Sequence, residues 1–132
     1  MYPQNRNRRL RSKESLRNLV RESAIHPHDF IAPVFVIEGS NIKEEISSMP
    51  GYYRFSLDNL KKETNELWSI GIQAILLFVK VPDSLKDNLG SEAINEDGLM
   101  QKAIKEIKNS VPEITIMTDI ALDPYSKYGH DG

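Results

Sequence analysis

Three apolar runs of strand length recur along this chain, and polar or amphipathic segments separate them. The runs cover residues 30–37, 74–79 and 114–120, and the first two are apolar at every position. Short, uniformly apolar runs are typical of strands buried on both faces, as in parallel sheets. The pattern therefore predicts three parallel strands, although Pro33 inside the first run is unusual for a central strand.

Two segments between these runs repeat apolar residues at helical spacing. The first is predicted to begin at a cap formed by Ser56 or Asp58 and to end near Gly71. The second is predicted to begin after Asn95 or Asp97 and to end before the next strand. The alternation of strand and helix predicts a parallel sheet, which is either an open doubly wound sheet or the start of a barrel. No G-x-G-x-x-G motif follows a strand, which disfavours a dinucleotide-binding fold.

The N-terminal segment has a different character from the rest of the chain. Residues 1–12 are rich in Asn and Arg and lack apolar periodicity, so we interpret them as an arm that orders against a partner, ahead of a domain over residues 13–132. A short helix is predicted over residues 12–23. The pair His26 and His28 could suggest a metal site, but the proline between them excludes helical spacing, and a turn is favoured.

Charge and composition narrow the class of protein. Residues 1–21 contain seven Lys or Arg residues and one acidic residue, which leaves the remainder at about −8 for a chain of net charge −2. A basic arm can bind nucleic acid, but no aromatic residues are interleaved with these charges, so pairing with an acidic surface of a second copy is favoured. No run reaches the roughly 18 apolar residues of a membrane span. Without a secretory signal pattern, a cytoplasmic location is expected.

The last fifteen residues concentrate the candidate chemistry. Asp119 lies near the end of the third apolar run, and Asp123, His130 and Asp131 follow on a polar loop. Ligands bind at the carboxyl ends of parallel strands, so these side chains are expected on the functional face. The alternative is that the Asp-Pro and Gly-His-Asp-Gly sequences are only turn residues.

The same loop carries a family resemblance. Residues 118–126 read TDIALDPYS and residues 129–132 read GHDG, which resembles the metal-site loop of the porphobilinogen synthase (5-aminolaevulinate dehydratase) family. Five further motifs follow in the family's order, and the resemblance covers the chain from Arg8 onward, although the chain is less than half of the family's usual length. These motifs are IAPVFV at 31–36, SMPGYYR at 48–54, LKD at 85–87, GSEA at 90–93 and DGL at 97–99.

The resemblance implies a fold, an activity and an assembly. The fold would be the N-terminal part of a TIM (βα)₈ barrel, with about three parallel strands, preceded by an extended arm. The activity would be the condensation of two 5-aminolaevulinate molecules to porphobilinogen, with loss of water, in tetrapyrrole and haem biosynthesis. Family members form homo-oligomers, here an expected octamer, in which the N-terminal arm embraces another subunit.

The resemblance also assigns roles to residues. Asp119 matches an aspartate that lines the family's substrate pocket, and is the expected catalytic residue. Zinc-using members carry cysteines where this chain has Ala121, Asp123 and Asp131, so the two aspartates are expected to bind Mg²⁺ rather than zinc, with His130 a weaker candidate.

The family's two Schiff-base lysines belong to later barrel strands beyond this chain. Lys80 and Lys127 match neither lysine motif, and we expect neither to be a nucleophile. The 132-residue chain alone is therefore expected to be inactive. Two other functions stay open: a non-catalytic assembly or interaction module of the same fold, and an unrelated hard-metal aldolase or lyase that uses the aspartate cluster.

Overall fold

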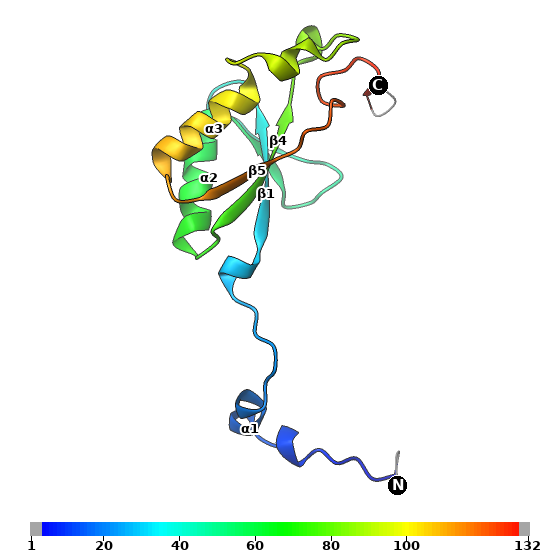
Figure 1. Ribbon diagram of the computed structural model, residues 1–132, viewed down its shortest axis with the longest axis vertical. Helices are drawn as coiled ribbons and strands as arrows, with labels where there is room; N and C mark the ends of the chain where they lie inside the picture. Colours follow the sequence, from blue (N-terminus) through cyan, green and yellow to red (C-terminus); the bar gives the residue numbers. More distant parts are fainter. Residues whose placement is uncertain (1–3, 130–132) are drawn as a thin grey trace.

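The computed structural model describes residues 4–129 and has two parts, an extended N-terminal segment and a body built on a sheet (Figure 1). The extended segment holds η1 (Arg9–Arg11) and α1 (Glu14–Leu19), and it runs away from the body. The body holds the turns and helices η2 (Pro27–Asp29), α2 (Leu57–Ser69), η3 (Asp83–Leu85), η4 (Ser91–Ile94) and α3 (Leu99–Ser110). Its strands are β1 (Ile31–Ile37), β2 (Lys43–Glu45), β3 (Tyr53–Phe55), β4 (Ala74–Lys80) and β5 (Thr115–Thr118).

The sheet has the order β2-β3-β1-β4-β5, and the three predicted strands are confirmed as β1, β4 and β5, which pair in parallel. All seven residues of β1 pair with β4, from Ile31 opposite Ala74 to Ile37 opposite Lys80. The third strand is shorter than the predicted residues 114–120, because only residues 115–118 pair with β4.

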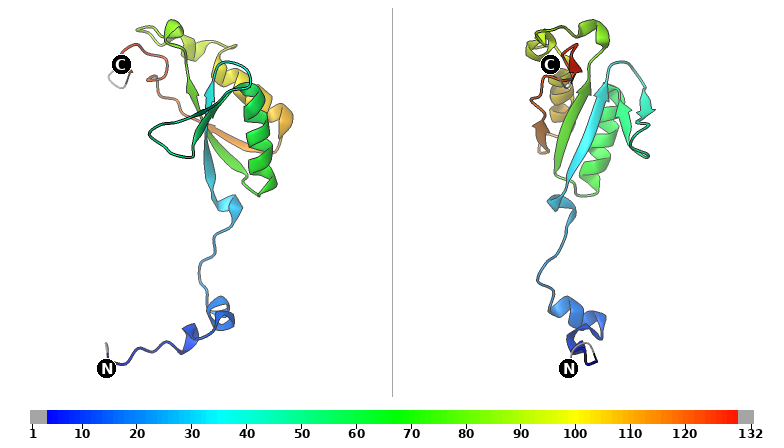
Figure 2. Two further views of the ribbon diagram at one scale, coloured as in Figure 1. Left: turned by 180° about the vertical axis from the view of Figure 1, so that it is seen from behind. Right: turned by 90° about the vertical axis from the view of Figure 1, so that its right-hand side faces the viewer.

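Both long helices cover the same face of the sheet (Figure 2). Val36, Ile75 and Leu77 are fully buried, and they join Leu60 of α2 and Ile107 of α3 in one apolar core. The parallel strands are added in one direction, β1 to β4 to β5, so successive right-handed crossovers place their helices on one side. This arrangement is that of a barrel wall rather than a doubly wound sheet, which has helices on both faces.

Pro33 is tolerated because β1 has only one partner at that position. The β3 strand pairs in parallel with Phe35 and Val36 alone, and β2 pairs with β3 in an antiparallel hairpin. Before Phe35, β1 has no strand partner on that side among the described residues. The backbone N–H that proline lacks is therefore not needed there for pairing. This hairpin, and the parallel contact of β3 with β1, extend the sheet beyond the three predicted strands.

Two helix predictions need correction. The helix expected over residues 12–23 is limited to α1, with Lys13 at its N-cap. Its apolar residues have no core to bury them, and Leu19 is 80% exposed. The N-cap of α3 is Gly98 rather than Asn95 or Asp97. Local polar residues favoured a cap one to three residues too early, whereas the burial of Leu99 fixes where the helix begins.

The division into an arm at 1–12 and a domain at 13–132 stays a prediction. No helix in the described part of the chain, residues 4–129, is long and apolar enough to cross a membrane.

Ser56 joins the loop after β1 to the start of α2, and its replacement provides a test of this packing. The side chain is fully buried; Oγ accepts a hydrogen bond from the Ile42 amide at 2.8 Å and donates one to Oδ1 of Asp58 at 2.6 Å. Ser56→Ala leaves that amide without its partner, so we expect the free energy of unfolding to fall by about 1–3 kcal/mol.

Urea denaturation followed by circular dichroism measures this change. Ser69→Ala is the matched control, since the Ser69 hydroxyl is exposed at the other end of α2 and should alter stability by less than about 0.5 kcal/mol. Equal effects of the two substitutions would contradict the role of Ser56.

Candidate functional site

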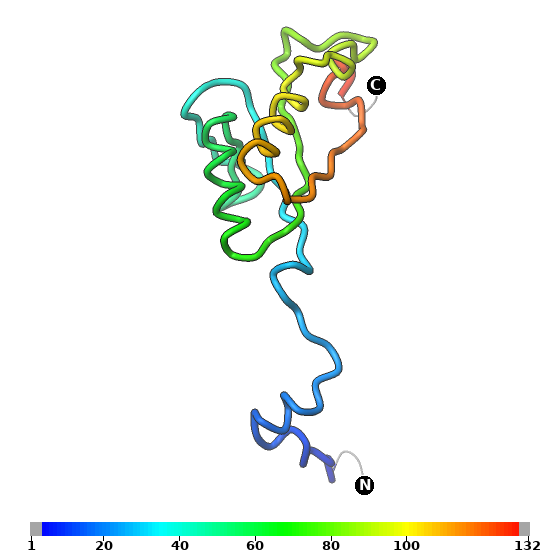
Figure 3. Tube along the Cα trace, turned by 60° about the vertical axis from the view of Figure 1, so that its left-hand side comes forward, coloured from blue at the N-terminus to red at the C-terminus, as the bar shows by residue number. Residues whose placement is uncertain are grey.

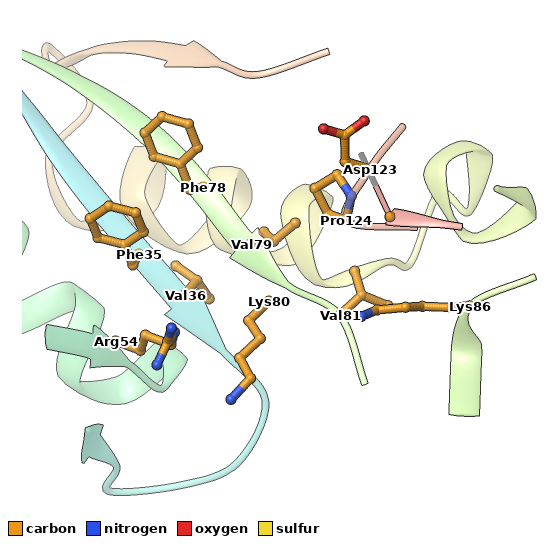
Figure 4. A pocket seen from close by; sticks show the side chains of 11 residues that line it. Phe35, Val36, Arg54, Phe78, Val79, Lys80, Val81, Lys86, Asp123 and Pro124 are labelled. Atoms are coloured by element: carbon orange, nitrogen blue, oxygen red, sulfur yellow. The ribbon is translucent and has the colours of Figure 1, made fainter. Parts of the chain in front are cut away.

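An open cavity of about 350 Å³ lies at the carboxyl ends of β1 and β4 (Figure 4). Its walls come from these two strands, from Arg54 of β3, from Lys86 on the loop after β4 and from Asp123 on the segment after β5. The cavity therefore lies where ligands bind in folds with parallel strands.

The floor of the cavity is aromatic. Phe35 and Phe78 are register neighbours on β1 and β4, and their rings stack with centroids 5.2 Å apart. Side chains alternate along a strand. Because Val36 and Leu77 point into the helical core, the two rings lie on the opposite face of the sheet, which is the inner face of a barrel.

Cationic side chains line one side of the cavity, and Glu44 of β2 links two of them. Its Oε1 lies 2.7 Å from NH1 of Arg54 and 3.5 Å from Nζ of Lys80. The hydrogen bond from Arg54, and then the charge of Lys80, lower the pKa of the Glu44 carboxyl. The hairpin is thus tied to the end of β4 by a carboxylate that stays ionised.

Lys86 is the third cation of the cavity wall. Its Nζ lies 2.7 Å from Oδ1 of Asp83, whose pKa is lowered by this hydrogen bond and by the lysine charge. Asp83 is 94% exposed, so water screens its charge. Together, the aromatic floor and the cationic wall suit a small ligand that carries a carboxylate.

Asp119 follows β5 directly, one residue beyond the end of the strand. Met117 of β5 pairs with Leu76 of β4 and lies on the same face as Phe78. Asp119 is exposed, and Oδ1 accepts a hydrogen bond from the Ala121 amide at 2.9 Å. One carboxylate oxygen is thus used in a local turn, and Asp119 is not among the residues that line the cavity.

Asp123 lines the cavity, and its role as a metal-binding residue stays a prediction. Its predicted partner Asp131 and the weaker candidate His130 lie outside the described residues. Within residues 4–129 no three His, Cys, Asp or Glu side chains gather as a metal site would require. The donors that this loop offers are carboxylates, which fit a hard cation such as Mg²⁺ and not the thiolate chemistry of zinc.

The loops after β4 and β5 are joined to each other, and they run side by side at the top of the body (Figure 3). The Asp87 amide donates to the Tyr125 carbonyl at 3.2 Å, and the Lys127 amide donates to the Asp87 carbonyl at 3.1 Å. Tyr125 is buried, and this burial, followed by the nearby charges of Glu92 and Asp119, raises the pKa of its phenol.

The environments of Lys80 and Lys127 agree with their exclusion as nucleophiles. Both side chains are exposed, and the ion-pair partner of Lys80 is a carboxylate. A lysine that forms a Schiff base is activated by a desolvated site or by a cationic neighbour. Neither of these two lysines occupies a desolvated site.

Sequence reasoning missed most of the cavity wall. Arg54 and Lys86 were read only as parts of motifs, and the two phenylalanines only as members of apolar runs. A uniformly apolar strand does not reveal which residues face the helices, so Phe35 and Phe78 could not be separated from Val36 and Leu77. The two phenylalanines are distinguished by lying opposite each other on adjacent strands. This can be recognised only when the strand pairing is known.

Comparison with known proteins gives one consistent result. Residues 4–132 match the model of a family described as delta-aminolevulinic acid dehydratase. Curated proteins of that name are 48% identical over 127 residues in Chlamydia pneumoniae and 44% identical over 128 residues in Bacillus subtilis. These alignments cover 96% and 97% of this chain, but only 38% and 39% of the two relatives.

A solved structure agrees with the sequence relatives. It is the delta-aminolevulinic acid dehydratase (porphobilinogen synthase) of Toxoplasma gondii, in complex with the reaction product porphobilinogen. It superposes with a TM-score of 0.90 at 43% identity, over 97% of this chain and 36% of that one. The predicted fold class is thereby confirmed as the N-terminal part of a TIM barrel. The match of residues 4–132 to the family model shows that the chain belongs to the delta-aminolevulinic acid dehydratase family.

Proposed function

We propose that this protein is a porphobilinogen synthase, a lyase that condenses two molecules of 5-aminolaevulinate to porphobilinogen with loss of water. The observation that carries the proposal is the close likeness to the Toxoplasma gondii enzyme described with its product bound, at 43% identity and a TM-score of 0.90. Because the chain spans 36% of that enzyme, the activity is proposed for a polypeptide that also supplies the remaining barrel strands.

The chemistry of the cavity supports this substrate class. At neutral pH 5-aminolaevulinate carries a carboxylate at one end and an ammonium at the other, separated by a short apolar chain with a ketone. The cationic wall of Arg54, Lys80 and Lys86 attracts the carboxylate, and the rings of Phe35 and Phe78 cover the chain. The carboxylate of Asp119, directly after β5, attracts the ammonium.

Asp119 is the proposed catalytic residue of this segment. A carboxylate beside a bound ammonium can hold it in place or remove a proton from it, and such general base catalysis contributes about 10²–10⁴ in rate. The exposed position of Asp119 and its single local hydrogen bond leave the second carboxylate oxygen for substrate.

The residues that form covalent bonds to substrate are proposed to lie outside this chain. Lys80 and Lys127 are exposed, and family membership implies lysines on later barrel strands. The isolated chain is therefore proposed to be inactive. The inner face of its sheet is also uncovered, with Ile31 50% and Met117 41% exposed. This exposure fits the alternative of an assembly module equally well, and only an activity measurement separates the two.

A hard cation is proposed at the loop after β5, with Asp123 and Asp131 as the residues that would hold it. Mg²⁺ at this position would supply positive charge beside the substrate and polarise an oxygen atom that it contacts. The aspartates themselves would bind the ion and so fix the loop against the mouth of the cavity.

A homo-oligomer is proposed for the protein, with an octamer as the family expectation. The N-terminal segment extends from the body with Leu10, Leu19 and Ile25 exposed, and its residues 1–21 carry cationic charge toward the acidic remainder of another copy (Figure 1). A cytoplasmic location and the lack of a role in nucleic-acid binding stay predictions from the sequence.

Porphobilinogen formation from 5-aminolaevulinate by the complete gene product tests the proposed function. We expect turnover by the wild type, and a fall in kcat of about 100-fold in Asp119→Asn, because the amide cannot accept a proton. Asp97→Asn is the control, since that side chain is 84% exposed and is not among the residues that line the cavity. A wild type that does not turn over would favour the assembly module.

The metal proposal is tested by chelation. Because the loop offers carboxylates and no thiolates, a zinc-selective chelator should leave activity unchanged, whereas Asp123→Ala should weaken Mg²⁺ binding measured by calorimetry by about tenfold or more. Activity that is lost on chelation and restored by Zn²⁺ alone would show the proposal to be wrong.

The arm proposal is tested by deleting residues 1–12. Since these residues add nothing to the apolar core, we expect sedimentation velocity to report a smaller assembly, with an unchanged urea transition for the body. The double variant Asn5→Ala, Asn7→Ala keeps every charge of the arm and should assemble as the wild type does. An assembly of unchanged size after the deletion would refute the role of the arm.

A further inference from the structure

Asp87 lies at the only parallel bridge outside the named strands of the described chain, and it faces Ser126 across that bridge. Its backbone hydrogen bonds reach Tyr125 on one side of Ser126 and Lys127 on the other. Tyr125 and Ser126 are 8% and 6% exposed, so the contact is buried although both segments are loops. The segment after β5 is thus fastened to its neighbour at a defined point.

The Asp87 side chain shapes its own loop. Oδ1 accepts hydrogen bonds from the amides of Leu89 at 2.9 Å and of Ser91 at 3.0 Å. These two bonds close a tight turn around Gly90, which has a left-handed φ of 65°. The turn packs on the opposite loop, because a Cβ at position 90 would lie 3.6 Å from Leu122 and 3.7 Å from Tyr125.

The opposite loop transmits this contact to the cavity. The Leu122 carbonyl accepts hydrogen bonds from the amides of Tyr125 at 2.9 Å and of Ser126 at 3.0 Å. Asp123 therefore belongs to a closed turn, and the C-terminal end of that turn is the segment held by Asp87. Figure 4 shows Asp123 and Pro124 on this segment, across the cavity from Arg54 and Lys80.

We propose that Asp87 is a positioning residue for the proposed active site: its carboxylate fixes the 87–91 turn, which in turn fixes the 122–127 turn and the place of Asp123 at the cavity. The catalytic consequence rests on the proposed function, whereas the positioning itself does not. Asp87 does not line the cavity, and it acts on the cavity through Tyr125 and Lys127.

The turn requires a single acceptor oxygen that can bind two backbone amides at once. A charged carboxylate makes stronger bonds of this kind than a neutral amide oxygen, and alanine makes none. The loop should therefore be held best by aspartate, less well by asparagine and least by alanine. A graded series of this type separates positioning from a general loss of stability.

The experiment compares Asp87→Ala and Asp87→Asn in the complete gene product. Hydrogen exchange read by mass spectrometry reports on residues 122–129 and, as an internal reference, on α3. For Asp87→Ala we expect exchange in 122–129 to be about tenfold faster, with exchange in α3 unchanged, because two charge-assisted hydrogen bonds are lost from the turn. Asp87→Asn should lie between this variant and the wild type.

Activity supplies the second readout. The kcat for porphobilinogen should fall by roughly tenfold in Asp87→Ala and be partly restored in Asp87→Asn, since a displaced loop misplaces Asp123. Asp97→Ala, an exposed aspartate on the same connection between β4 and α3, should change neither quantity.

The outcomes are distinguishable. Unchanged exchange in 122–129, or equally faster exchange in α3, would overturn the positioning role. Faster exchange in 122–129 with an unchanged kcat would overturn its catalytic consequence. A wild-type protein without turnover would refute the proposed function, while the exchange comparison would still decide whether Asp87 holds the loop.

Discussion

The structure depends on the burial of one face of a parallel sheet beneath two helices. Val36, Ile75 and Leu77 contact α2 and α3, and this contact fixes which residues of β1 and β4 point the other way. Successive side chains along a strand point to opposite faces of the sheet. The burial of one residue beneath the helices therefore directs its neighbour in the chain to the cavity floor. A shift of one residue in register would bury Phe35 and Phe78 and bring their aliphatic neighbours to the cavity.

Fold and site differed in how much the sequence revealed. The strands and both long helices could be predicted, because apolar runs and helical spacing are local properties of the chain. The parallel contact of β3 with β1 was not recognised, because it joins residues whose separation no local pattern encodes. Helix ends were less certain, as Gly98 illustrates, because local polar residues competed with the burial of Leu99.

The site was predictable only where a motif carried it. Asp119 and Asp123 were identified from the loop after the last strand, and Asp123 lines the cavity whereas Asp119 does not. The cationic wall was missed, because Arg54, Lys80 and Lys86 come from three separate segments and meet only after the sheet has formed. Arg54 and Lys80 also share a carboxylate partner, Glu44, that lies in a different strand from either of them.

Gly90 illustrates how such a loop limits evolutionary change. There is room for a side chain at this position, because a Cβ would make ordinary van der Waals contact with Leu122 at 3.6 Å. The obstacle is the backbone, whose positive φ is costly for most residues and least costly for asparagine and aspartate. Homologues that lack this glycine are therefore expected to carry one of those two residues, or a connection of different length. Substitutions in the loop are thus limited to those that allow a positive φ at this position.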